Sequence, residues 1–144
     1  MEDREEYVKC FSLDELAKRE RSAVPFHVII NPQLSVKDDT SLKFFEACSS
    51  LEGFWALVPR ARAVQVKCLN EHGETRVIDA CGWYARILQH EIDHLHGKLY
   101  IDRMDSRSFM TSGNRDRYWK GSSIEEIRAA LMVAGQCSRQ RREN

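Results

Sequence analysis

Residues 82–97 constrain this chain more than any other stretch, because a helical stripe in them also carries potential metal ligands. The stripe consists of Trp83, Ile87, His90 and His94. Side chains at these intervals project from one face of an α-helix. Gly97 follows at the position where a C-terminal cap is expected. The pattern therefore predicts a helix that begins near Gly82 and ends just before Gly97.

His90 and His94 are four residues apart, and Glu91 directly follows His90, which gives an H-E-x-x-H pattern. On a helix both imidazoles can bind one metal ion, with Glu91 beside them as a proton carrier. A divalent metal with an open coordination position lowers the pKa of bound water to roughly 7, so hydrolysis is the first functional hypothesis. The alternative is a solvated helix face on which the histidines only pack. Trp83 and Ile87 favour the metal site, because they predict a buried face on which imidazoles need a partner.

A catalytic site of this kind also requires a third protein ligand. The metzincin proteases place a histidine six positions after the second histidine, and this chain has Tyr100 there. The first carboxylate on a later predicted helix is Glu125, too far from His94 for the gluzincin spacing. The third ligand is therefore expected upstream. Cys48 is the candidate, because it follows a predicted strand in a short polar turn.

The composition excludes several other classes of protein. The 144 residues suit one domain, and 22 basic residues balance 22 acidic ones, which gives no reason to expect nucleic acid or a membrane surface as partner. No apolar run approaches the ~20 residues that cross a bilayer, and the acidic amino terminus fits neither a secretory signal nor an Arg-rich transit peptide. Five irregularly spaced cysteines suggest reduced thiols rather than a disulfide framework.

The rest of the chain predicts strands before the helix and little regular structure after it. Strands are expected at 26–30, 41–45, 55–59, 63–69 and 75–80. Asn31-Pro32 should end the first of them, and the last should pair back across the polar turn 70–73. Beyond the helix, 99–101 should be extended and 104–121 a loop. A last helix should start at Ser122 or Ser123, where Glu125 and Glu126 complete capping boxes.

These elements predict an α+β fold, in which antiparallel or mixed β-sheets pack around a central helix that carries H-E-x-x-H, followed by a C-terminal helix. The expected organisation has four parts. They are a charged amino-terminal segment with a marginal helix (1–24), a catalytic domain (25–120), a C-terminal helix (121–137) and a basic tail (138–144).

Several motifs, in order, resemble those of the peptide deformylase family. Gln89 to Gly97 match Q-H-E-x-D-H-L-x-G in full, and residues 46–50 match E-G-C-x-S except for Ala47. The resemblance covers roughly residues 25–119 and is greatest to the animal mitochondrial branch. It implies hydrolysis of the formyl group from the initiator methionine of new polypeptides, and a mitochondrial location. The implied partner is an N-formylmethionyl peptide or nascent chain, without direct nucleic-acid or membrane contact. A homodimer is a further possibility.

The resemblance also implies roles for individual residues. Cys48, His90 and His94 would bind one divalent metal, Fe²⁺ as in bacterial members, although this donor set also suits Zn²⁺ and Co²⁺. Glu91 would be the general acid and base, and the backbone N–H of Ser49 would help to hold the formyl oxygen.

Other residues would support this site. Glu46 and Arg60 would form a buried ion pair that braces the ligand loop, and Gln89 would belong to the same supporting shell. Trp83 and Ile87 would line an apolar methionine pocket, with ordinary core packing as the alternative.

Two departures from the family pattern affect the expected activity. The amino-terminal motif G-x-G-x-A-A-x-Q is absent, and loss of one oxyanion donor typically lowers the rate by about 10²–10³. Ala47 stands where the family has glycine, which restricts the backbone. The chain is therefore expected to be an amino-terminally truncated deformylase. The alternatives are a catalytically impaired metal-binding fragment and an H-E-x-x-H metallopeptidase.

Overall fold

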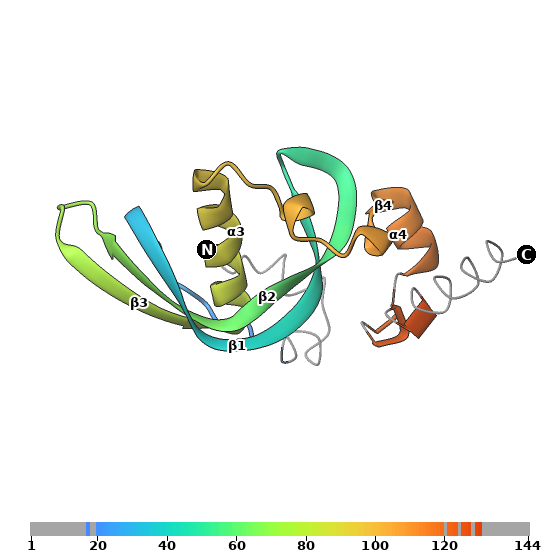
Figure 1. Cartoon of the computed structure of the whole chain (residues 1–144), viewed down its shortest axis with the longest axis horizontal. Helices are drawn as coiled ribbons and strands as arrows, with labels where there is room; N and C mark the ends of the chain where they lie inside the picture. The colour runs from blue at the N-terminus through green and yellow to red at the C-terminus, as the bar shows by residue number, and fades with distance from the viewer. Residues whose placement is uncertain (1–16, 18–19, 120, 124, 128, 131–144) are drawn as a thin grey trace, which may run out of the picture. The chain divides into compact units, whose positions relative to one another are not determined.

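The computed structural model describes residues 17, 20–119, 121–123, 125–127 and 129–130 (Figure 1). Its elements are β1 (Ile30–Cys48), β2 (Leu51–Leu69), β3 (Thr75–Cys81), α3 (Gly82–Leu95), η1 (Tyr100–Asp102), η2 (Ser106–Ser108), β4 (Met110–Thr111) and α4 (Ser112–Tyr118). The chain divides into two compact units. The first consists of Met1–Leu42 and Arg60–Lys98, and the second of Lys43–Pro59 and Leu99–Asn144. Strands β1 and β2 therefore each contribute residues to both units.

The strands form an antiparallel meander in the order β1-β2-β3, and β4 pairs with β2. Strands β2 and β3 are antiparallel, with Leu69 opposite Thr75 next to their turn. The Asn70 side chain organises this turn, since its Oδ1 accepts hydrogen bonds from the backbone N–H groups of His72 and Glu74. The predicted pairing of 75–80 across residues 70–73 is confirmed, as is the α+β class.

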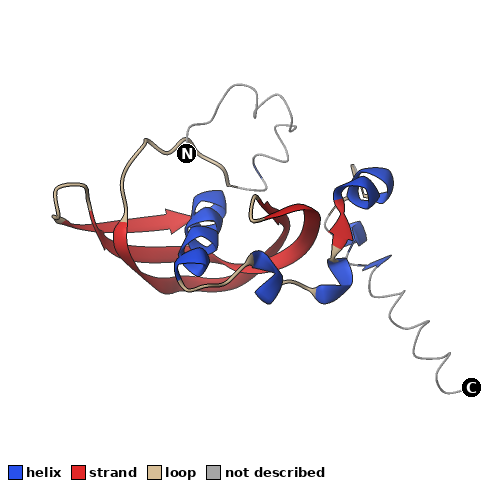
Figure 2. Ribbon diagram, turned by 90° about the horizontal axis from the view of Figure 1, so that it is seen from above, coloured by secondary structure: helices blue, strands red, loops and turns tan. Residues whose placement is uncertain are grey.

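In the first unit, α3 packs on one face of the sheet (Figure 2). Alternate residues of β2 and β3 supply the sheet side of this core, namely Val64, Val66, Cys68, Ile78 and Ala80. The helix contributes Ala85, Leu88 and Ile92 at helical spacing. The prediction of which face of the helix is fully buried is therefore wrong. The stripe of Trp83, Ile87, His90 and His94 is only half-buried and lies beside the fully buried face.

The strand predicted at 26–30 is wrong, because β1 begins at Ile30 and continues through Pro32 to Cys48. Proline cannot donate a hydrogen bond to a sheet, but β1 lies at the edge of the β1-β2-β3 order, where this loss is tolerated. Asn31 adopts a positive φ of 50°, which asparagine accommodates better than most residues. The two strands predicted at 55–59 and 63–69 are parts of the single strand β2.

The segment after α3 contains more regular structure than the sequence predicted. Residues 100–102 form the 3₁₀ helix η1 instead of an extended piece, because the Asp102 carboxylate accepts the backbone N–H of Leu99 at 2.8 Å. The predicted loop at 104–121 contains η2, β4 and α4. Thr111 caps α4 by accepting the N–H of Asn114 at 3.3 Å, a local bond that favours helix initiation.

The capping box at the start of the last helix is confirmed. The Ser123 N–H donates to the Glu126 carboxylate at 2.8 Å, and the Glu126 N–H donates to the Ser123 hydroxyl at 3.2 Å. Residues 125–127 and 129–130 are helical. The predicted continuation of this helix to residue 137, the basic tail, and most of the marginal helix predicted for residues 1–24 lie outside the described residues.

Helix α3 ends immediately after the second histidine in a glycine cap. Gly97, at φ +69°, donates its N–H to the carbonyl of His94 at 3.0 Å, and Lys98 donates to that of Asp93 at 2.9 Å. These two hydrogen bonds form a Schellman motif, and they confirm the predicted end of the helix.

Replacing Gly97 by alanine should therefore destabilise the protein by about 1–2 kcal/mol, the cost of a left-handed conformation with a Cβ atom. No atom within 4 Å would touch that Cβ, so the cost should be conformational alone. Urea denaturation measures the change in the free energy of unfolding. Gly113→Ala in α4, where the φ is not positive and the space is also open, is the matched control and should not destabilise. Equal losses for the two variants would contradict this account.

Candidate metal centre

His90 and His94 lie one turn apart on α3, in the first unit. Their ring centroids are 4.8 Å apart and the ring planes are nearly perpendicular, at 85°. Both side chains are half-buried, so they retain an open side. The i, i+4 spacing brings the two rings together, as the sequence pattern predicted.

Cys48 is the last residue of β1 and precedes the two-residue turn to β2. It is a half-buried free thiol, and the backbone N–H of Ser50 points at its Sγ atom from 3.4 Å. A donor aimed at sulfur favours the thiolate form, which is the form that binds metals. Ala47 is exposed, and it is not among the described residues with positive φ. The methyl group that replaces the family's glycine therefore causes no backbone strain.

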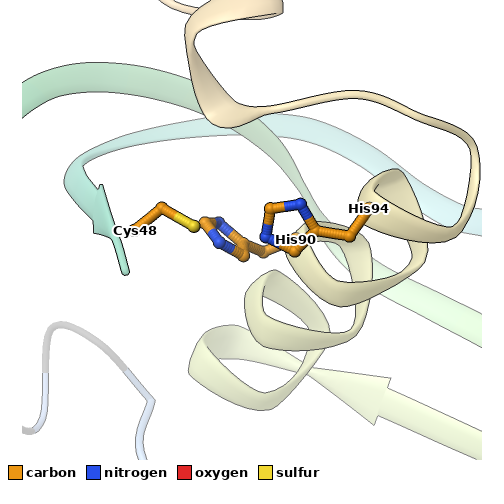
Figure 3. Close-up of side chains that lie close together, drawn as sticks. All are labelled: Cys48, His90 and His94. Atoms are coloured by element: carbon orange, nitrogen blue, oxygen red, sulfur yellow. The ribbon is translucent and has the colours of Figure 1, made fainter. Parts of the chain in front are cut away.

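The Sγ atom of Cys48 and one nitrogen each of His90 and His94 lie within 4.8 Å of one another (Figure 3). Bond lengths of 2.0–2.3 Å in a tetrahedral site imply donor separations of about 3.5 Å, so a small adjustment would let the three atoms share one ion. A thiolate and two imidazoles suit Zn²⁺, Fe²⁺ or Co²⁺ better than Mg²⁺ or Ca²⁺, which prefer oxygen. The donor set therefore fits a divalent transition metal.

Glu91 occupies the turn of α3 between the two histidines, and its side chain is exposed. The preceding residue, Gln89, anchors this turn to β2. Its Nε2 donates to the carbonyls of Ala61 and Ala85, and its Oε1 accepts the N–H of Ala61. Gln89 thus holds α3 against the strand directly beside His90.

Arg60 and Asp93 form a buried ion pair between β2 and α3, with only 2% and 7% of their side chains exposed. Removing two charges from water is costly unless each is matched by the other, so this pair fixes one turn of the helix relative to the strand. Asp93 immediately precedes His94, and its role was missed by the sequence interpretation. The available signal was its position four residues after Gln89, on the face of α3 that contacts β2.

The other predicted site residues have distinct positions. Glu46 is 6% exposed in the second unit, and its predicted pairing with Arg60 stays a prediction. Ser49 is exposed in the turn that follows Cys48. Trp83 and Ile87 are half-buried on the histidine side of α3, where the Arg86 guanidinium lies 6.0 Å from the Trp83 ring centroid. The methionine pocket that they were predicted to line stays a prediction.

Comparison with known proteins identifies the family. The model of the family described as polypeptide deformylase matches residues 5–109. The chain is 45% identical over 116 residues to chloroplastic peptide deformylase 1A of Solanum lycopersicum, covering 81% of this chain and 42% of that protein. It is 50% identical over 93 residues to mitochondrial peptide deformylase of Homo sapiens, covering 65% of this chain and 38% of that protein. It therefore spans about two fifths of the length of these relatives.

Solved structures give the same result. Peptide deformylase 1B of Arabidopsis thaliana, in complex with an inhibitor, matches with a TM-score of 0.55 and 29% identity, over 80% of this chain and 55% of that chain. The Plasmodium falciparum peptide deformylase complex matches with a TM-score of 0.55 and 31% identity, over 63% of this chain and 56% of that chain. With a family model matching well over half of its residues, this chain belongs to the polypeptide deformylase family.

Proposed function

We propose that this chain hydrolyses the N-formyl group from the terminal formylmethionine of newly made polypeptides and releases formate. The observation that carries the proposal is the grouping of Cys48, His90 and His94, with Glu91 between the two histidines, in a chain of this family. Because the chain spans only about two fifths of the length of the tomato and human relatives, the activity is proposed for this chain and does not follow from theirs.

Cys48, His90 and His94 would hold the metal ion. When bound, the ion would supply Lewis acidity, which polarises the formyl carbonyl and makes a water molecule easier to deprotonate. Fe²⁺ is the ion that the family resemblance favours, and the same donors accept Zn²⁺ or Co²⁺. The Ser50 N–H would stabilise the sulfur as thiolate, and Gln89 and the Arg60–Asp93 pair would hold the helix that carries the imidazoles.

Glu91 would move the protons of the reaction. Its carboxylate would accept a proton from the attacking water and return it to the methionine nitrogen as the C–N bond breaks. The backbone N–H of Ser49 would donate a hydrogen bond to the formyl oxygen as negative charge develops there. Trp83 and Ile87, on the half-buried side of α3, would contact the apolar methionine side chain.

Formate release from a formyl-methionyl peptide by the metal-loaded protein tests this function, with casein as the competing substrate. Formate without casein cleavage supports the proposal. Casein cleavage without formate would favour a metallopeptidase, which uses the same helix motif. Metal binding with neither product would favour a catalytically impaired fragment.

Cys48→Ser should remove most of the bound metal, because a hydroxyl is a much poorer ligand than a thiolate for these ions. We expect a loss of affinity greater than the ~10- to 100-fold that follows removal of an outer-shell partner. Metal analysis after dialysis measures it. Cys81→Ser replaces an exposed free thiol outside the cluster and should bind metal as the unchanged protein does. Retention of metal by Cys48→Ser would contradict the ligand assignment.

The relatives include a mitochondrial and a chloroplastic protein, and we propose a mitochondrial location for this chain. None of the helices within the described ranges has the length and apolar character needed to span a membrane.

A further inference from the structure

Arg86 is a buried charged residue of α3 that the proposed reaction does not use. It is 4% exposed and lies one turn before His90, on the same side of the helix. A buried guanidinium destabilises a fold unless its N–H groups have hydrogen-bond partners. The Nη2 atom of Arg86 donates to the backbone carbonyl of Leu42 on β1. Arg86 therefore joins the helix of the two histidines to the strand that ends at Cys48.

Leu42 lies where β1 leaves the first unit. It is the last residue of this strand in that unit, and the next residue begins the second unit. The chain then forms the hairpin of residues 43–59, which carries Cys48, and re-enters the first unit at Arg60. Arg86 and Leu42 both belong to the first unit. Their hydrogen bond therefore fixes the start of the hairpin to α3.

The end of the hairpin is also fixed to α3. Arg60, the first residue after it, forms the buried ion pair with Asp93, and the Gln89 side chain exchanges two hydrogen bonds with the backbone of Ala61. Arg86, Gln89 and Asp93 stand at positions i, i+3 and i+7, so they share one side of the helix. This side of α3 thus holds both strands of the hairpin at their first-unit ends.

We propose that Arg86 is a positioning residue for the metal centre, which acts by fixing the direction in which the hairpin 43–59 leaves the first unit. Two of the three grouped donors, His90 and His94, are carried by α3, and the third, Cys48, is carried by the hairpin. This inference rests on the proposed function, because it treats Cys48 as a metal ligand. It goes beyond that function by giving a cause for the grouping of the donors.

The expected effect follows from the fraction of molecules in which the thiol is in place. Without the bond to Leu42, the hairpin is held at one end only and can change its direction at the other. All three donors are still present, but Cys48 then lies beside the imidazoles for a smaller part of the time. The apparent dissociation constant of the metal rises as that fraction falls.

Titration of the metal-free protein with Co²⁺, followed by the sulfur-to-cobalt charge-transfer band, tests the inference. Arg86→Met keeps the apolar stem of the side chain and removes the donors to Leu42. We expect Co²⁺ binding about 10- to 100-fold weaker, as for loss of an outer-shell partner. We also expect a weaker band per bound ion, because the imidazoles alone would hold part of the Co²⁺. Arg86→Lys keeps a charged donor on a long stem and should give a smaller change in the same direction.

Arg76→Met is the matched control. Arg76 is an exposed arginine in the first unit, on β3, which pairs with β2. The substitution removes the same charge and the same donor groups from a strand that carries no ligand. The Co²⁺ affinity and the band of this variant should match those of the unchanged protein.

The outcomes separate this inference from the proposed function. If the unchanged protein gives no sulfur-to-cobalt band, Cys48 is not a ligand, and both fail. If it gives the band and both Arg86 variants match its affinity and band intensity, only the inference fails. A lower melting temperature of the metal-free variants, with an unchanged band per bound ion at saturating Co²⁺, would show that Arg86 supports the core alone and would also overturn the inference. Should Arg86→Met not fold, Arg86→Lys decides by the same criteria.

Discussion

Glu91→Gln is expected to lower the rate of formate release by about 10²- to 10⁴-fold, the usual contribution of a positioned general acid and base. Glutamine preserves the shape of the side chain but cannot accept a proton from water. The metal content should not change, because Glu91 is not one of the three grouped donors. The free energy of unfolding should also stay within about 0.5 kcal/mol, because the side chain is exposed.

Glu52→Gln provides the matched control. Glu52 is also an exposed glutamate, on β2 and outside the metal cluster, so its neutralisation should leave the rate unchanged. Formate measured under single-turnover conditions, together with metal analysis of each variant, separates chemistry from metal loss. A fully active Glu91→Gln variant that retains its metal would exclude Glu91 as the proton carrier.

Arg60→Met should lower the free energy of unfolding by about 3–5 kcal/mol, because it leaves the Asp93 carboxylate buried without its guanidinium partner. Methionine approximates the length and apolar stem of arginine, so packing is largely retained. Urea denaturation monitored by two independent probes measures the change. The expected loss of free energy is a large fraction of the 5–15 kcal/mol that stabilises a typical domain.

Arg62→Met is the corresponding control, two residues further along β2 on the same strand. Arg62 pairs with Glu20 at 2.8 Å, but these side chains are 46% and 36% exposed. Exposed pairs contribute about 0–1 kcal/mol, so little stability should be lost. Similar losses for the two variants would show that burial does not distinguish the pairs, and would contradict the role given to Arg60 and Asp93.

Local patterns explain what the sequence predicted correctly. The helical period of 82–95, the glycine at 97 and the polar turn at 70–73 each depend on residues close together in the chain, and each structure is present. The strand predicted at 26–30 failed because Pro32 was taken as the end of a strand. An edge strand tolerates that residue, and edge position is a property of the whole sheet.

In the candidate site, too, local patterns predicted some features, whereas others depend on residues far apart in the chain. The i, i+4 spacing alone brings His90 and His94 together, whereas Cys48 could be named as the third donor only by eliminating downstream residues and by family resemblance. The Arg60–Asp93 pair joins residues 33 positions apart; the helical spacing from Gln89 places Asp93 on the strand-facing side of α3, but it does not identify Arg60 as the partner. The fully buried face of α3 was misplaced for a related reason, since the helical period does not say which side contacts the sheet.

The position of Cys48 at the very end of β1 makes its direction depend on strand register. Successive residues of a strand point to opposite sides, so a slip of one residue would turn the thiol of Cys48 and the carboxylate of Glu46 over together. An insertion in this part of β1 could therefore abolish metal capture without altering a single ligand, and the hairpin should tolerate changes of sequence far better than changes of length.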